Sequence, residues 1–275
     1  MTRSVRRTRR LLRLAGAGAV AVLALGACSS SPDASDTEGS GASDAAASPE
    51  LSGTVTVFAA ASLKESFTTL GKEFEQRHPG TEVGFNFGGS DTLAASITSG
   101  APADVFAAAS PGTMKTVTDG NEASGTPVTF ARNQLEIATL PGNPDKVTSL
   151  KDLTRSGLKV VLCDETVPCG SAAHKALDAA GVRLTPVSYE QDVKSALNKV
   201  ELKEADAAVV YKTDVRAAGG KVEGVEFPES AGAVNDYPIA VLKNAEHAEA
   251  ARAFIALVRS AEGQKVLGRA GFLKP

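Results

Sequence analysis

The pattern of apolar and polar residues predicts a unit in which a short strand breaks at small residues and continues as an amphipathic helix. Residues 55–61 form an apolar, β-branched run, and apolar residues recur at helical spacing over 67–74. Between these runs, Ser62 and Glu65 have the S-x-x-E spacing of a capping box. We therefore predict that a helix begins at Ser62, directly after the strand.

The same pattern of strand, turn and helix returns three more times along the chain. Residues 82–87, 159–162 and 186–189 have strand-like sequences, and a turn of small or polar residues follows each one. The four expected helix starts are Ser62, Ser90, Cys169–Gly170 and Asp192–Val193. Free backbone N–H groups and the positive end of the helix dipole gather at such starts, so the pattern favours a cleft that binds an anion.

The alternation of strands and helices predicts an α/β fold with mainly parallel sheets. Two strand-like pieces, at 127–131 and 135–140, indicate a crossing into a second lobe, and the strand at 236–241 indicates a return. We predict two lobes, each a mainly parallel sheet flanked by helices, joined by two crossovers. Lobe 1 comprises residues 51–131 and 236–275, and lobe 2 comprises residues 132–235.

The first 50 residues do not have the composition of a folded core. Arginines precede an apolar run at 14–24, which is typical of a signal peptide (1–27) and not of a membrane-spanning helix. Residues 25–28 resemble a bacterial lipobox, so we expect Cys28 to be lipidated; an ordinary thiol and twin-arginine export stay open as alternatives. After Cys28, residues up to 50 are mostly Ser, Ala, Asp and Gly, which predicts a flexible linker over 28–50.

The charge balance argues against nucleic acid as a partner. The whole chain has 29 basic and 32 acidic residues, a formal net charge of −3. Without the six arginines of the signal peptide, 23 basic residues face 32 acidic ones, so the mature chain is near −9. An acidic surface does not attract nucleic acid or anionic lipid.

Two cysteines remain besides Cys28. Cys163 and Cys169 are six residues apart, and export makes a disulfide between them the favoured interpretation. A two-cysteine metal site is the competing hypothesis, but the three histidines show no ligand spacing with these cysteines.

An enzyme is poorly supported by the sequence. The chain contains no G-x-S-x-G elbow, no H-E-x-x-H pair, no Walker loop and no G-x-G-x-x-G fingerprint. Ser62 or Ser90 could act as a nucleophile only with a base nearby, and no histidine is close to either in sequence. We expect no enzymatic activity, with an exported serine hydrolase as the remote alternative.

Five short motifs follow one another in order: VFAAASL (57–63), GAPADVF (100–106), VPCG (167–170), DVKSAL (192–197) and VVY (209–211). Together they resemble the periplasmic molybdate-binding proteins of ABC importers, over about residues 53–275. The resemblance implies a type II periplasmic-binding-protein fold. It also implies that a tetrahedral oxyanion is held by two serine hydroxyls with their amides, two further amides and a tyrosine hydroxyl. The corresponding residues are Ser62, Ser90, Cys169, Val193 and Tyr211.

By this resemblance the chain is expected to bind molybdate and tungstate and to deliver them to a membrane permease driven by an ATPase. Molybdenum would be bound only as the oxyanion, without another metal or cofactor, by a monomer anchored through its lipid to the outer face of the cell membrane. Another tetrahedral oxyanion such as sulfate is the alternative ligand.

Two residues depart from the family pattern, Asp91 and Cys169; Cys169 stands where a small residue is common, but only its backbone N–H is needed. Asp91 places a carboxylate in the second turn, where small polar residues are usual. Asp91, Asp192 and Glu65 all lie in first helical turns, where a carboxylate is more often a cap for its own backbone. We therefore expect a pocket of donors only, which rejects the protonated phosphate ion.

Overall fold

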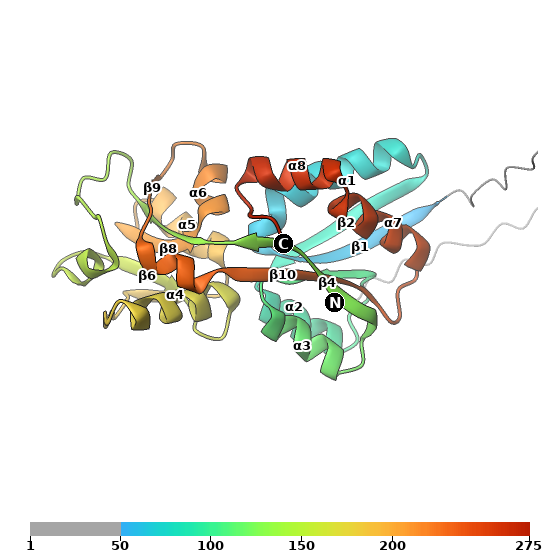
Figure 1. The fold of residues 1–275 in the computed structure, drawn as a ribbon, viewed down its shortest axis with the longest axis horizontal. Helices are drawn as coiled ribbons and strands as arrows, with labels where there is room; N and C mark the ends of the chain where they lie inside the picture. The colour runs from blue at the N-terminus through green and yellow to red at the C-terminus, as the bar shows by residue number, and fades with distance from the viewer. Residues whose placement is uncertain (1–50) are drawn as a thin grey trace, which may run out of the picture. The chain divides into compact units, whose positions relative to one another are not determined.

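The structure is a computed structural model that describes residues 51–275 (Figure 1). The predicted signal peptide (1–27), the lipidation site Cys28 and the linker (28–50) lie outside the described residues. Within the part of the chain that is described, no helix is both long and apolar enough to cross a bilayer.

The first sheet has the strand order β2-β1-β3-β10-β4. Its strands are β1 (Gly53–Ala60), β2 (Thr81–Gly88), β3 (Val105–Ala107), β4 (Ala123–Asn133) and β10 (Asn235–Leu242). Its helices are α1 (Lys64–Arg77), α2 (Ser90–Thr98), α3 (Pro111–Asp119), α7 (Ala248–Arg259) and α8 (Ala261–Ala270). Figure 1 shows α1, α7 and α8 over one face of this sheet and α2 and α3 over the other. We call this sheet with its helices the first lobe.

The second sheet has the order β7-β6-β8-β5-β9. Its strands are β5 (Leu135–Thr139), β6 (Val160–Cys163), β7 (Ser188–Glu190), β8 (Ala207–Tyr211) and β9 (Glu223–Val225). Its helices are α4 (Pro168–Ala179), α5 (Val193–Glu201) and α6 (Lys212–Ala218). This sheet with its helices is the second lobe.

The chain passes between the lobes twice. Gln134 alone separates β4 from β5, and the chain returns to the first sheet at Asn235. Asn133 and Asn235 lie opposite each other in the antiparallel register of β4 and β10. The two-lobed α/β fold is confirmed, and its sheets are mixed because β10 and β5 run antiparallel to their neighbours. The exact lobe boundaries at 131 and 235 stay a prediction.

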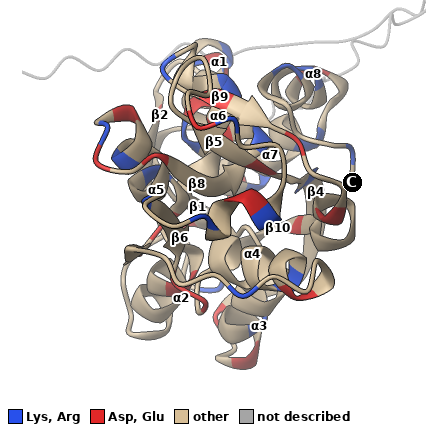
Figure 2. Ribbon diagram, turned by 90° about the vertical axis from the view of Figure 1, so that its left-hand side faces the viewer, with Lys and Arg blue, Asp and Glu red and all other residues tan. Residues whose placement is uncertain are grey.

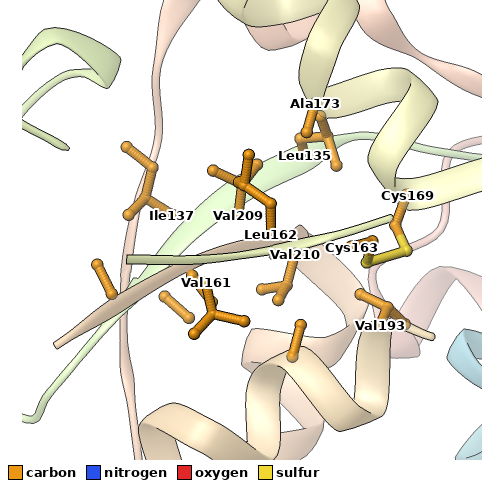
Figure 3. Packing of buried hydrophobic residues seen from close by; sticks show 14 of the residues in the cluster. Leu135, Ile137, Val161, Leu162, Cys163, Cys169, Ala173, Val193, Val209 and Val210 are labelled. Atoms are coloured by element: carbon orange, nitrogen blue, oxygen red, sulfur yellow. A yellow bond between two sulfur atoms is a disulfide. The ribbon is translucent and has the colours of Figure 1, made fainter. Parts of the chain in front are cut away.

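Different side chains fill the two cores. In the first lobe, the ring of Phe67 on α1 lies 5.7 Å from that of Phe130 and 5.8 Å from that of Phe254, between centroids. Such aromatic pairs add about 0.5–1.5 kcal/mol beyond the burial of their area, and so they fix α1 against β4 of the sheet and against α7. In the second lobe, aliphatic residues of β6 and β8 form the core, with Val161 and Val209 among them (Figure 3).

Two local predictions were wrong. The helix does not begin at Ser62: residues 61–63 form a 3-10 turn, α1 begins at Lys64, and no side chain caps it. The oxygen of Ser62 instead contacts the hydroxyl of Tyr237, a tertiary partner that displaces the local cap. The helix expected to begin at Cys169–Gly170 begins earlier, at Pro168, because proline fits the first position of a helix.

Candidate functional site

The five residues that the sequence predicted as the site line one pocket at the carboxyl ends of strands from both sheets. They are Ser62, Ser90, Cys169, Val193 and Tyr211. Each is almost completely buried, with at most 3% of its surface exposed. The cavity volume, measured as the space that the centre of a water-sized sphere can occupy, is about 20 Å³. Such a volume suits a small inorganic ion and is far below that of a drug-sized ligand.

Two serine hydroxyls come from the first lobe. Ser62 lies in the 3-10 turn after β1, and its Oγ is 2.8 Å from the hydroxyl oxygen of Tyr237 on β10. Ser90 is the first residue of α2, and its Oγ accepts a hydrogen bond from the amide of Ala109 at 3.0 Å. Because an amide can only donate, Ser90 keeps its own hydroxyl proton for a ligand.

Two helix starts of the second lobe also line the pocket. Cys169 is the second residue of α4, so its amide has no acceptor within the helix. In α5 the N-cap Asp192 accepts from the amides of Lys194 and Ser195, at 2.8 and 3.0 Å. The amide of Val193 is therefore the one that this cap leaves for a ligand, while the Val193 side chain lies in the core (Figure 3).

A disulfide fixes the turn before α4. Cys163 ends β6, Cys169 lies in the first turn of α4, and their Cα atoms are 5.8 Å apart. The disulfide predicted from the sequence is thus present in the structure, beside Val193 (Figure 3). Because so short a loop restricts few unfolded conformations, the bond acts chiefly on the local placement of the Cys169 amide.

Tyr211 supplies the third hydroxyl group. It ends β8, and its oxygen accepts a hydrogen bond from Nδ2 of Asn235 at 2.7 Å. Burial first, and then the neighbouring Tyr237, raises the pKa of Tyr211 well above its ordinary value. The hydroxyl therefore stays protonated at physiological pH and remains available as a donor.

Three polar residues behind the pocket were missed by sequence reasoning. The Tyr237 hydroxyl contacts Ser62, and Nδ2 of Asn133 donates to that same hydroxyl at 3.3 Å. Asn235 contacts Tyr211 in the same way. The one available signal was the position of both asparagines beside the predicted crossovers.

Dipoles and hydroxyl groups must match the charge of a bound anion, because no Lys or Arg is among the residues of 51–275 that line the pocket. The ionised lining residue is Asp192, and its two oxygens are engaged by Lys194 and Ser195. On the second lobe, acidic and basic residues are interspersed in the view of Figure 2. In the described part of the chain, no three His, Cys, Asp or Glu side chains are grouped to hold a metal ion.

The expectation that three first-turn carboxylates cap their own helices is correct for Asp192 and wrong for the others. Glu65 pairs with Nζ of Lys194 at 2.9 Å instead. Asp91 does not cap α2, and its Oδ1 is buried without a hydrogen-bond partner among the described residues. Asp91 is not one of the residues that line the pocket, so its carboxylate lies outside the pocket wall.

Asp214, on α6, is a fully buried carboxylate next to the site. Its Oδ2 accepts a hydrogen bond from the Tyr211 amide at 3.3 Å. Its Oδ1 lies 3.1 Å from Nζ of Lys194, and this contact is an ion pair whose geometry is not that of a hydrogen bond. Because Lys194 also reaches Glu65 of the first lobe, this group of charges ties the two lobes together. Burial raises the pKa of Asp214 to about 6, although Lys194 acts in the opposite direction.

We expect Asp214 to lower the stability of the protein as the pH rises from about 4 to about 7. Its pKa in the folded state, about 6, lies above the ordinary value of 3.8. Its contribution is therefore complete below pH 3.8 and is lost as the pH passes 6. At 1.36 kcal/mol per pKa unit, the loss is about 3 kcal/mol. Urea unfolding of wild type and Asp214→Asn should give free energies of unfolding whose difference changes by this amount.

Asp152 provides a control of the opposite sign. Hydrogen bonds from the backbone and side chain of Thr148 lower its pKa, so the stabilisation that it contributes is lost as the pH falls. The Asp152→Asn comparison should therefore change with pH in the other direction. A difference between wild type and Asp214→Asn that stays constant from pH 4 to pH 7 would contradict the assignment for Asp214.

The fold and the site define a class of protein: a binding protein whose two α/β lobes enclose a small pocket of hydrogen-bond donors. Comparison with known proteins places it further. The sequence matches bacterial extracellular solute-binding proteins over residues 55–273, and the chain belongs to this family.

Individual relatives agree with this assignment. The chain is 47% identical to the molybdate-binding protein ModA of Mycobacterium tuberculosis (strain ATCC 25618 / H37Rv) over 221 residues, which cover 80% of this chain and 85% of that protein. It is 31% identical over 230 residues to ModA of Escherichia coli (strain K12), over 80% and 89% of the two chains. The periplasmic molybdate-binding protein of Azotobacter vinelandii has the same fold, with a TM-score of 0.71 at 20% identity over 80% of this chain and 99% of that one. The resemblance seen in the sequence motifs is thereby confirmed.

Proposed function

We propose that this chain binds molybdate, and also tungstate, in the pocket between its lobes and delivers it to an ABC importer. The convergence of donors carries the proposal: three hydroxyls and two helix-start amides line a pocket whose ionised residue, Asp192, is already engaged. An unprotonated tetrahedral dianion accepts hydrogen bonds at every oxygen and so satisfies these donors. The molybdate-binding proteins to which the chain is similar support this ligand.

The ligand can enter only when the lobes separate. Both lobes contribute to the pocket wall, and the lining side chains of Ser90 and Tyr211 are each 1% exposed. We propose that the lobes open to admit the anion and close around it, and that the closed form docks on the permease, whose transport step is driven by a cytoplasmic ATPase.

The protein is proposed to act as a monomer held at the outer face of the cell membrane by a lipid on Cys28. The lipobox at residues 25–28 and the membership in an extracellular solute-binding family support this location. Mass spectrometry of the amino-terminal peptide of the exported protein tests it, because an unmodified Cys28 would exclude the anchor.

Calorimetric titration with molybdate, tungstate, sulfate and phosphate tests the function. We expect molybdate to bind one to one, with a dissociation constant below micromolar, since each charge-assisted hydrogen bond contributes about 1.5–3 kcal/mol. Sulfate should compete poorly, because its smaller tetrahedron cannot reach donors from both lobes at once. Tight sulfate binding without molybdate binding would favour the alternative ligand. Failure to bind any of these anions would reject the proposal and direct attention to an esterase assay.

Tyr211→Phe should weaken molybdate binding about tenfold or more, which corresponds to the loss of one charge-assisted hydrogen bond. The phenyl ring keeps the packing, so the thermal midpoint of the ligand-free protein should change little. Tyr189→Phe is the matched control, because Tyr189 lies on β7 with 49% of its surface exposed. Equal affinities of Tyr211→Phe and wild type would remove Tyr211 from the site.

A further inference from the structure

We propose that Asn133 and Asn235 determine the anion specificity of the site by fixing its hydroxyl groups as hydrogen-bond donors. The two asparagines lie opposite each other where β4 and β10 pass between the lobes. Neither is among the residues that line the pocket. The inference rests on the proposed binding of an oxyanion and extends it to residues behind the pocket.

The side-chain amide of Asn133 has one possible orientation. Its Oδ1 accepts from the backbone amide of Gln134 at 3.0 Å, and a backbone amide can only donate. The Nδ2 group therefore faces the other way, toward Oγ1 of Thr213 at 2.8 Å and the hydroxyl of Tyr237 at 3.3 Å. Because Asn133 is fully buried, solvent does not compete for these bonds. The oxygen of Tyr237 is thus an acceptor toward Asn133.

Tyr237 links the orientation of the Asn133 amide to the direction of the hydrogen bonds in the pocket. Its oxygen accepts from Asn133 and lies 2.8 Å from Oγ of Ser62, a contact in which either hydroxyl can donate. Because Nδ2 of Asn133 can only donate, we assign the proton of this hydroxyl to Ser62. Burial raises the pKa of Tyr237, so this proton stays in place. Since Ser62 accepts from Tyr237, the proton of Ser62 itself is directed to the pocket.

Asn235 acts on Tyr211 in the same manner. Its Nδ2 donates to the carbonyl oxygen of Pro168 at 3.2 Å, and this obligatory acceptor fixes the orientation of the amide. The same Nδ2 donates to the Tyr211 hydroxyl at 2.7 Å, so the proton of Tyr211 is left for a ligand. The amide of Ala109 fixes Ser90 likewise. All three hydroxyls of the pocket therefore accept from the protein and donate toward the ligand.

A site of this polarity distinguishes anions by their protons. Molybdate and tungstate at neutral pH carry none, and every oxygen can accept. Phosphate carries at least one proton, which meets only donors in such a pocket. A buried clash of this kind costs on the order of 1–3 kcal/mol, or roughly tenfold or more in affinity. The selectivity is therefore set at the crossover strands.

Asn133→Asp tests the inference by reversing one series of hydrogen bonds with a change of one atom. The aspartate keeps the bond from Gln134, but Thr213 and Tyr237 would donate to its second oxygen. Tyr237 would then accept from Ser62, and Ser62 would present an acceptor to the pocket. Affinities for molybdate and phosphate are measured by calorimetry at pH 8, where both ligands are dianions. We expect the ratio of the molybdate affinity to the phosphate affinity to fall about tenfold or more.

The ratio of the two affinities distinguishes a reversal of hydrogen bonds from electrostatic repulsion, because an added negative charge weakens the binding of both dianions equally. Asn244→Asp makes the same chemical change at an exposed position and should leave the ratio unchanged within about twofold. Tyr237→Phe is the second variant: it frees the Ser62 hydroxyl without adding a charge, and the ratio should fall there too.

The possible outcomes are distinct. If the wild type binds molybdate and the ratio is unchanged in both variants, this inference is overturned and the proposed function still stands. A wild-type chain that binds neither anion rejects the proposed function and this inference with it.

Discussion

Replacing Gly89 with alanine should weaken molybdate binding by roughly 100-fold, since misaligning two charge-assisted hydrogen bonds costs about 3 kcal/mol. Gly89 precedes α2 in the first lobe, and a Cβ atom there would lie 2.5 Å from the carbonyl oxygen of Gln191. Gln191 directly precedes Asp192, the N-cap of α5 in the second lobe. Because Cβ atoms do not approach backbone oxygens so closely, the lobes of the variant would stop short of the closed arrangement.

The ligand-free variant should remain folded. Gly89 has φ −59° and ψ 131°, which alanine adopts without strain, and losing glycine at an N-cap costs about 1 kcal/mol or less. Calorimetry gives the affinity, and thermal unfolding of the ligand-free protein gives the stability. Gly84→Ala is the matched control, because its Cβ would be 3.5 Å from the methyl group of Thr54, an ordinary contact. Unchanged affinity in Gly89→Ala would show that binding does not need this close approach of the lobes.

Local sequence signals were sufficient where a local interaction decides the structure. Asp192 caps α5, as an aspartate at an N-cap commonly does, because its carboxylate reaches the amides of Lys194 and Ser195, two and three residues further along the chain. The disulfide between Cys163 and Cys169 also follows from sequence, since the two cysteines are close along an exported chain.

Sequence signals failed where a distant residue competes with a local one. Ser62 and Glu65 had the spacing of a capping box, but Tyr237, which is 175 residues from Ser62, takes the serine hydroxyl. Lys194 of the other lobe takes the Glu65 carboxylate. Likewise, an apolar strand such as β10 has no sequence signal for its direction, so mixed sheets could not be distinguished from parallel ones.

For the candidate site, sequence located the groups that line the pocket and missed those behind it. Helix starts and the family motifs both pointed to Cys169 and Val193, because an anionic ligand needs free amides at helix starts. Asp214 had no sequence signal, and Asn133 and Asn235 had only their position beside the crossovers, since the role of each residue depends on which buried partner it meets. No periodicity encodes such a contact.

Gly170→Ala should destabilise the protein by about 3 kcal/mol, at the upper end of the range for overpacking a well-filled site. A Cβ at Gly170 would lie 2.7 Å from the carbonyl oxygen of Cys163 and even closer to that of Asp164. This backbone cannot yield easily, because the amide of Asp164 donates to the carbonyl oxygen of Glu190 at 2.9 Å and the disulfide holds Cys163. For a domain of this size, the loss corresponds to a fall in the thermal midpoint of about 6–12 °C.

The control for this prediction is the same substitution in a helix with free space. Gly268 lies within α8, and a Cβ there would meet no atom within 4 Å. Gly268→Ala should therefore raise stability by about 0.5–1 kcal/mol, since glycine is the more flexible residue in the unfolded chain. Differential scanning calorimetry of both variants without ligand measures the difference between their thermal midpoints. A loss of about 1 kcal/mol would already shift the thermal midpoint by 2–4 °C. A midpoint of Gly170→Ala within about 2 °C of the wild-type value would therefore show that the loop closed by the disulfide moves aside. Molybdate affinity in the same variant should fall as well, because any such movement displaces the neighbouring Cys169 amide from the pocket.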